Sequence, residues 1–309
     1  MPMTWRSIRE ADLLECLSIE PRYIGGEIVG RDTAIAIWKD LIRSRSFNSC
    51  VIESASHPGR IAGFGASVFV TPEFATREIE NPQPELNSRL IASVAHGASV
   101  VRREDDLYNA AAEAPLDLLV LGGIWLPEGL SLEELHEVQM LLAFSFVDLH
   151  AGYRLSRIFS EAVTPAQIEY SQSSGVWRMR QQFADIARAL FVLTRADAVA
   201  VSGSIAISLF QYQEPVLGLR DSERQFLAEA LSLRSDKELA ARMNLSQATV
   251  KKRWQSLFER IADIHPALLP GEGGERLNLT RGPQKRHHIL AFVQSHPQEL
   301  QPYCWRSTK

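Results

Sequence analysis

The sequence predicts an α+β domain followed by an all-α domain, and three observations support this fold class. Short strand-like runs alternate with helical periodicity through the first half of the 309 residues, as in a mixed sheet with helices. The continuous apolar run "LDLLVLGGIWL" at 116–126 is typical of a strand buried on both faces. The last third has helical periodicity without a strand pattern, which indicates helices packed on one another.

Composition and length favour a globular chain. The apolar share is 45% and the charged share 23%, both ordinary for globular proteins, and the length suits one large domain or two to three ordinary ones. No apolar run reaches the ~18–20 residues of a membrane span, and the N-terminus lacks the apolar core of a secretory signal. Cys16, Cys50 and Cys304 are scattered and give no metal-ligand spacing. We therefore expect a cytoplasmic protein without a metal site.

The first part of the chain predicts two helices and then a hairpin. The runs at 9–19 and 32–44 place their apolar residues at helical spacing. Strands are expected over 49–54 and 59–70, because a Ser, Pro and Gly-rich turn separates them.

The buried strand at 116–126 is followed by the longest helix signal of the first half, from Ser131 to about residue 152. Ser131 and Glu134 have the spacing of a capping box. Further strands are expected at 154–163 and 173–179.

This order resembles the GNAT acetyltransferase fold over roughly residues 4–180. The resemblance is carried by "SIREADLLECLSI", the paired strands "CVIES" and "RIAGFGASVFV", and the long helix after the central strand. It implies acetyl-CoA, whose pyrophosphate lies on a Gly-rich loop at a helix N-terminus. Here that segment is "PEGLSLEELHEV", with one glycine, Gly129, and acids that would repel a pyrophosphate.

We therefore expect residues 1–183 to be a GNAT-like sensory or regulatory domain with no cofactor, no catalytic residues and no enzymatic activity. A helical connector is expected over 184–215. The alternative is a CoA-dependent acetyltransferase with an appended DNA-binding domain.

Residues 216–270 predict three short helices, at about 221–231, 236–243 and 247–261. Ser246 has the position of an N-cap for the third. Along this helix the apolar residues form one stripe, while amides and cations lie off it. The stripe is made of Val250, Trp254, Leu257, Phe258 and Ile261.

The stretch from 219 to 261, "LRDSERQFLAEALSLRSDKELAARMNLSQATVKKRWQSLFERI", resembles the LuxR/NarL type of helix-turn-helix. Leu233 stands where that family usually has glycine, and Arg253 where it often has histidine. The resemblance implies that the helix at Gln247–Ile261 lies in the DNA major groove. Base edges are assigned to Lys251, Lys252 and Gln255, and phosphates to Lys237, Gln247, Thr249 and Arg253.

The charge distribution agrees with a DNA-facing C-terminal part. From 216 to 309 there are 15 Lys and Arg against 10 Asp and Glu, whereas the preceding residues have 18 against 27. Residues 271–309 form a basic helical extension in this interpretation. We expect a sequence-specific, DNA-binding transcriptional regulator whose partners are double-stranded DNA and a second copy of the chain, with an unidentified ligand of the N-terminal domain. The further alternative is a sigma-factor-like initiation protein that contacts RNA polymerase.

Overall fold

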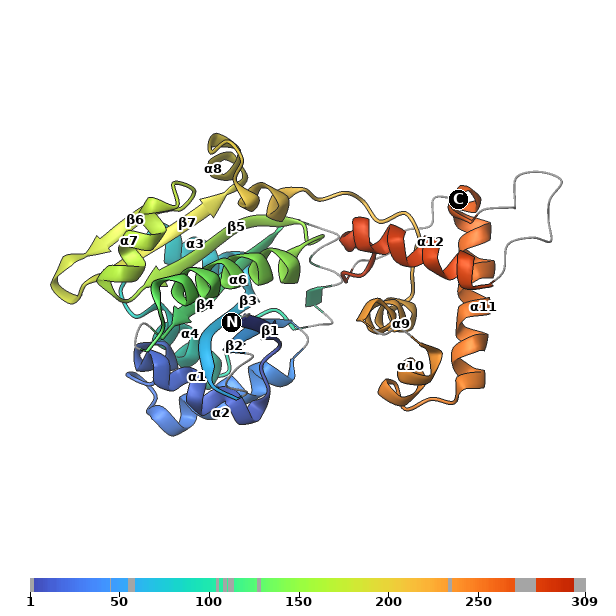
Figure 1. The fold of residues 1–309 in the computed structure, drawn as a ribbon. Helices are drawn as coiled ribbons and strands as arrows, with labels where there is room; N and C mark the ends of the chain where they lie inside the picture. The colour runs from blue at the N-terminus through green and yellow to red at the C-terminus, as the bar shows by residue number, and fades with distance from the viewer. Residues whose placement is uncertain are drawn as a thin grey trace. The chain divides into compact units, whose positions relative to one another are not determined.

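The computed structural model describes residues 3–44, 46–54, 59–103, 106–107, 110, 114–126, 129–232, 235–269 and 282–302. The chain forms two compact units, Met1–Gln211 and Tyr212–Lys309. Figure 1 shows the mixed sheet of unit 1 and the helices of unit 2. The expectations for Cys304 and Leu233 and for residues 271–281 lie outside the described residues.

The described residues of unit 1 form one seven-stranded sheet in the order β1-β2-β3-β4-β5-β7-β6. All neighbouring pairs are antiparallel except β4 and β5, which are parallel. The strands are β1 (Met3–Arg6), β2 (Phe47–Ser54), β3 (Ile61–Val70), β4 (Leu116–Trp125), β5 (Leu155–Ala162), β6 (Arg178–Phe183) and β7 (Arg188–Thr194).

Strand β4 pairs irregularly with both of its neighbours. Ala66 of β3 pairs with Gly122 and Ser67 pairs with Val120, so Leu121 is the additional residue of a β-bulge. On the other edge of β4, the parallel ladder to β5 ends at Val120 and Ser160, although both strands continue. The last five residues of β4 are therefore paired on one edge only within this sheet.

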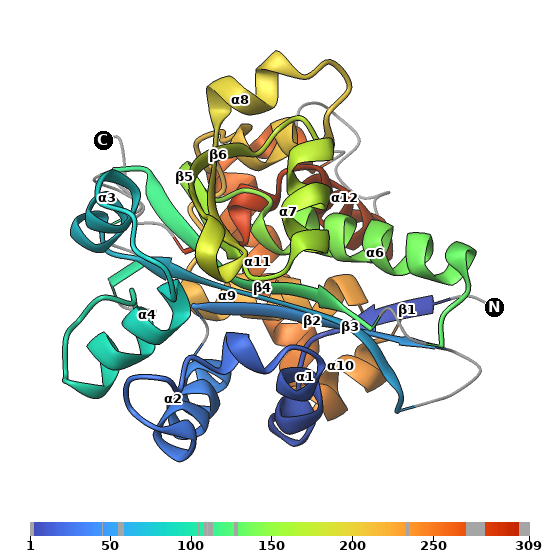
Figure 2. The same ribbon diagram turned by 90° about the vertical axis from the view of Figure 1, so that its left-hand side faces the viewer.

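Helices cover both faces of the sheet, as Figure 2 shows, with α1, α2 and α4 on one face and α6 and α7 on the other. The capping box of α6 forms as predicted, since the Ser131 side chain accepts from the backbone of Glu134 and the Glu134 carboxylate accepts from Ser131. The helices of unit 1 are α1 (Leu13–Ile19), α2 (Arg31–Arg43), α3 (Pro72–Glu80), α4 (Leu86–Ala95), α6 (Leu132–His150), α7 (Pro165–Ser173) and α8 (Arg195–Ala200). Its short 3-10 helices are η1 (Glu10–Asp12), η2 (Pro21–Ile24), η3 (Ala184–Ile186) and η4 (Ile205–Phe210).

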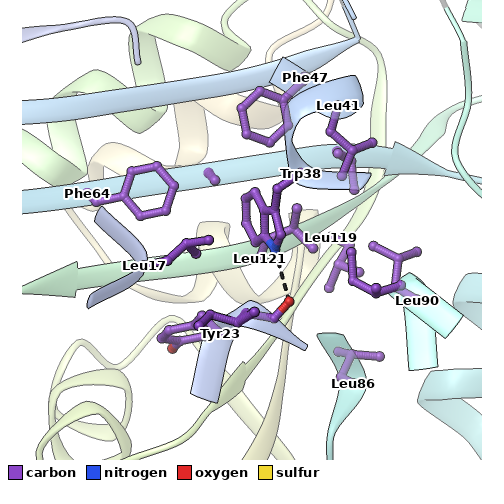
Figure 3. Packing of buried hydrophobic residues seen from close by; sticks show 14 of the residues in the cluster. Leu17, Tyr23, Trp38, Leu41, Phe47, Phe64, Leu86, Leu90, Leu119 and Leu121 are labelled. Atoms are coloured by element: carbon purple, nitrogen blue, oxygen red, sulfur yellow. Dashed lines mark hydrogen bonds between the residues drawn. The ribbon is translucent and has the colours of Figure 1, made fainter. Parts of the chain in front are cut away.

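The main core lies between the sheet and the helices α1 to α4. Trp38 of α2 is completely buried and packs on Phe47 and Phe64 of the hairpin, with ring centroids 6.0 and 6.2 Å away. Its indole donates a hydrogen bond to the carbonyl of Ile24 (3.1 Å), so the polar atom of this large side chain is satisfied. Figure 3 shows this cluster with Leu119 and Leu121 of β4 beneath it. The core therefore packs against one face of β4.

The helical connector predicted over 184–215 is wrong, because this range contains strand β7. Six of the seven residues of β7 are buried between β5 and β6. A short, continuously apolar run does not distinguish a buried strand from a helix by periodicity. The first unit therefore extends to Gln211, beyond the expected boundary at 183.

Unit 2 is helical. Its helices are α9 (Asp221–Ser232), α10 (Asp236–Arg242), α11 (Gln247–Ile264) and α12 (Gly282–Ser295), with the 3-10 helices η5 (Pro266–Leu268) and η6 (Pro297–Glu299). Ser246 caps α11 by accepting from the backbone of Thr249 (3.1 Å). Val250, Trp254, Leu257 and Ile261 are buried on one side of α11, which is the apolar stripe expected there. None of the helices in the described ranges is long and apolar enough to cross a membrane.

Candidate active site

A cavity of about 540 Å³ lies in unit 1 at the place where β4 and β5 separate. Gly122, Gly123 and Trp125 of β4 line it together with Ser160 and Ala162 of β5, so the opening between the two strands forms part of its wall. Residues of β2, β3, α6, α7, β7 and η4 also contribute to the lining. Cavities of this size are typical of sites for small organic ligands.

The free edge of β4 gives the cavity a row of backbone donors and acceptors. The last contact of the β4–β5 ladder is a hydrogen bond from the Ser160 hydroxyl to the carbonyl of Val120 (3.2 Å). Beyond Val120, the residues of β4 do not pair with β5. A sheet edge of this kind binds extended ligands that carry amide groups, as in β-augmentation. Gly123 adds room, because a Cβ placed there would meet no atom within 4 Å.

Tyr170 of α7 places a phenol hydroxyl in the lining of the cavity between β4 and β5. Its ring lies in edge contact with Trp125 at the end of β4, with centroids 5.3 Å apart, and both residues line the cavity. Partial burial raises the pKa of Tyr170 above its usual value of 10, although 39% of the residue remains exposed. The hydroxyl therefore stays protonated near neutral pH and is able to donate a proton.

Ser67 of β3 and His150 of α6 form a second polar position in the wall. His150 Nδ1 lies 2.6 Å from the carbonyl of Phe146, and because a carbonyl only accepts, Nδ1 carries the proton. Nε2 therefore accepts from the Ser67 hydroxyl at 2.7 Å. Burial lowers the pKa of His150 to about 4, so the imidazole is neutral near pH 7.

One donor in the wall is unsatisfied. The side-chain nitrogen of Asn48, on β2 beside Ser67, is buried and has no hydrogen-bond partner among the described residues. A buried donor in this state costs free energy unless a ligand supplies an acceptor. Glu161 of β5, in contrast, is fully occupied. It accepts from the backbone of Glu85 and Leu86 and from Arg188, and burial raises its pKa.

The start of α6 lies at the position where the GNAT resemblance implies a phosphate cradle. Its first turn carries Glu133 and Glu134, and the second of these bonds the cap residue Ser131. Hydrogen bonds from Ser131 lower the pKa of Glu134, so the carboxylate is ionised near neutral pH. Arg60 approaches the adjacent Gly129, where an added Cβ would lie 2.9 Å from its guanidinium. The opening between β4 and β5 therefore fits an amide-bearing arm, but this turn does not fit a pyrophosphate.

The seven residues expected to contact DNA all lie in unit 2, on α10 and α11. Lys237, Gln247, Lys251, Lys252 and Gln255 are exposed, whereas Thr249 and Arg253 are half-buried. The Thr249 hydroxyl bonds the hydroxyl of the cap residue Ser246 (2.8 Å), and the Gln255 amide donates to Glu259 (3.0 Å). The structure keeps these residues on two neighbouring helices, and their assignment to base edges and phosphates stays a prediction.

No protein-family model and no curated protein matches the sequence. Solved structures with low similarity include an acetyltransferase from Thermus thermophilus, with 10% identity and a TM-score of 0.34 over 63% of this chain and 97% of that one. An agmatine N-acetyltransferase has 11% identity and a TM-score of 0.38 over 63% and 100%. A polyamine N-acetyltransferase from Drosophila melanogaster has 11% identity and a TM-score of 0.33 over 62% and 99%.

The element order of unit 1 is the order that the sequence resemblance implied, with paired strands, a central apolar strand and a long helix after it. The first unit therefore has the mixed sheet with helices on both faces that this resemblance implied. The LuxR/NarL resemblance of unit 2 has no support from these comparisons and stays a prediction, as do double-stranded DNA, RNA polymerase and a second copy of the chain as partners.

The main functional expectation has no support from the comparisons. The structures named above are acetyltransferases, and none of the comparisons supports the interpretation of the chain as a DNA-binding transcriptional regulator without enzymatic activity. That interpretation gave the missing Gly-rich loop more weight than the matching order of elements, and it kept a CoA-dependent acetyltransferase as an alternative.

The sequence offered one signal for the site that we did not interpret. The pair Gly122-Gly123 interrupts an otherwise apolar strand, and a glycine inside a strand often marks a bulge or a close approach of a ligand. Tyr170 and Asn48 carry no recognisable pattern in the sequence. They reach the cavity only because the sheet order places β2, β4 and α7 around it.

Proposed function

We propose that unit 1 is an acyltransferase, which moves an acyl group from a thioester to an amine. The observation that carries this proposal is the opening between β4 and β5, which combines a free backbone edge, a cavity and a protonated phenol. A pantetheine arm contains two amide groups in an extended chain. Such an arm pairs with the edge of 122–125 as a short additional strand would.

The proposed reaction breaks one bond and forms another at the carbonyl carbon. The neutral amine attacks the thioester carbonyl, the C–N bond forms, and the C–S bond breaks to release a thiolate. Backbone N–H groups of the free β4 edge stabilise the negative charge that develops on the carbonyl oxygen. Tyr170 donates its proton to the departing sulfur, the new amide nitrogen loses one proton to solvent, and the phenol recovers its proton from solvent.

Thiol release measured with an Ellman reagent tests this function on the full chain, with acyl-CoAs as donors and a panel of primary amines as acceptors. The native protein should release thiol only when an amine is present. Tyr170→Phe keeps the ring contact with Trp125 and removes the acidic proton. It should lower kcat by at least ~100-fold, the lower end for general acid catalysis.

Gly123→Val tests the position of the donor. The side chain enters free space, and a β-branched residue suits a strand better than glycine. This variant should therefore keep the native melting temperature and lose thiol release. Gln181→Val, at an exposed position of β6, is the matched control and should keep both. Native-like turnover by Gly123→Val would refute the site.

A further inference from the structure

We propose that the donor is a long-chain fatty acyl thioester, whose hydrocarbon chain fills the apolar part of the cavity. This inference rests on the proposed function and specifies its substrate class. The apolar part, called the acyl chamber here, is lined by Ala143, Phe146, Val147, Leu193, Val201 and Leu209. These side chains come from α6, β7, the residue after α8, and η4.

The size and chemistry of the cavity argue against a two-carbon acyl group. An acetyl group has a single methyl carbon beyond the carbonyl, and it would leave the apolar side chains of the acyl chamber without a ligand contact. Apolar cavities bind water poorly and bind hydrocarbons readily. An unbranched hydrocarbon chain needs no polar partner, and the six side chains that define the chamber are apolar.

The packing of α6 supports the same occupant. An apolar helix on a sheet normally buries its apolar stripe, yet only Val138, Ser145 and His150 of this 19-residue helix are buried. Phe146 and Val147 pack on the buried cluster that contains Phe69, Leu118 and Ile158. Both remain partly exposed, because the cavity lies beside them. A bound chain would complete the packing of this face.

Exposed apolar side chains continue the chamber towards solvent. Met140 is 39% exposed, Tyr170 39% and Ile205 43%, and all three line the same cavity. Exposed apolar groups gathered around one opening mark a site for an apolar ligand. They form a path along which a flexible chain can enter.

The start of α6 explains why the chain must contribute affinity. Glu133 and Glu134 occupy the turn that would have to bind a pyrophosphate, so little binding free energy is available there. Burial of hydrocarbon supplies it instead. Each added methylene should strengthen binding about fourfold, the equivalent of 0.8 kcal/mol per buried CH₂ at 1.4 kcal/mol per factor of ten.

The test uses a series of acyl-CoAs from acetyl to palmitoyl on the full chain, with Kd measured by calorimetry and kcat/KM by thiol release. We expect both to improve about fourfold per methylene until the chamber is full. Ala143→Leu adds three carbons to the wall. It should move the optimum to shorter chains and weaken the longest well-bound donor on the order of 50-fold. Ala200→Leu, exposed on α8 and outside the lining, should leave the series unchanged.

The outcomes separate this inference from the proposed function. A chain-length dependence of Kd that Ala143→Leu shifts supports the chamber, even if no amine in the panel is acylated. Turnover that is best with acetyl-CoA, or a Kd that does not depend on chain length, overturns it while the acyltransferase proposal stands. A chain-length effect on the amine but not on the thioester also overturns it.

Discussion

The stability of unit 1 should depend on pH through His150. This histidine is completely enclosed between α6 and β3, where it donates to the Phe146 carbonyl and accepts from the Ser67 hydroxyl. The bond from Ser67 requires the neutral ring, because only an unprotonated Nε2 can accept. Burial lowers its pKa from 6.5 to about 4, whereas the unfolded chain binds a proton near 6.5.

The sign and size of the effect follow from this difference. Between these two pKa values the unfolded state binds more protons than the folded state, so stability decreases as the pH falls. The contribution is fully present above about pH 6.5 and is lost as the pH falls through about 4. The shift corresponds to ~3 kcal/mol at 1.36 kcal/mol per pKa unit.

Urea denaturation at a series of pH values, for the native chain and for His150→Gln, measures this contribution. Carboxylates titrate in the same range, but they do so equally in both proteins, so the difference between the two isolates the histidine. We expect the stability advantage of the native chain to shrink by ~3 kcal/mol from about pH 7 to about pH 4. A difference that stays constant over this range would refute the assignment of a neutral, buried imidazole.

Two further substitutions examine the polar groups near the cavity. Asn48→Leu removes the donor that has no partner among the described residues. Thermal denaturation should therefore show that the free energy of unfolding increases by ~1 kcal/mol, and calorimetry should show weaker acyl-CoA binding. An unchanged Kd would exclude a ligand contact at this residue. Glu161→Gln leaves Arg188 buried without its charged partner. Chemical denaturation should therefore show that the free energy of unfolding decreases by ~3 kcal/mol. The control is Glu169→Gln, at an exposed position of α7, which should have no measurable effect.

Much of the fold could be predicted from local patterns. The capping box at Ser131, the hairpin of β2 and β3, and the buried strand β4 all depend on neighbours in the sequence. Strand β7 could not be recognised in the same way, because a short apolar run fits either a buried strand or a helix. Its identity depends on pairing with β5, which is an interaction between distant segments.

The site was less accessible to prediction than the fold. A Gly-rich phosphate loop is a local pattern, and its absence after β4 led us to expect no enzyme. The opening between β4 and β5 has no local pattern, because it arises from where a ladder ends. Gly122 and Gly123 were the only residues in that strand whose type indicated a close approach of a ligand.

The position of the donor on β4 is the central claim, and backbone hydrogen exchange tests it most directly. The full chain is compared with and without an acyl-CoA thioether, which cannot transfer its acyl group. We predict slower exchange in the segment 122–125 and in α7, with no change in β6 (Arg178–Phe183). Binding of the thioether without any slowing in 122–125 would contradict the claim.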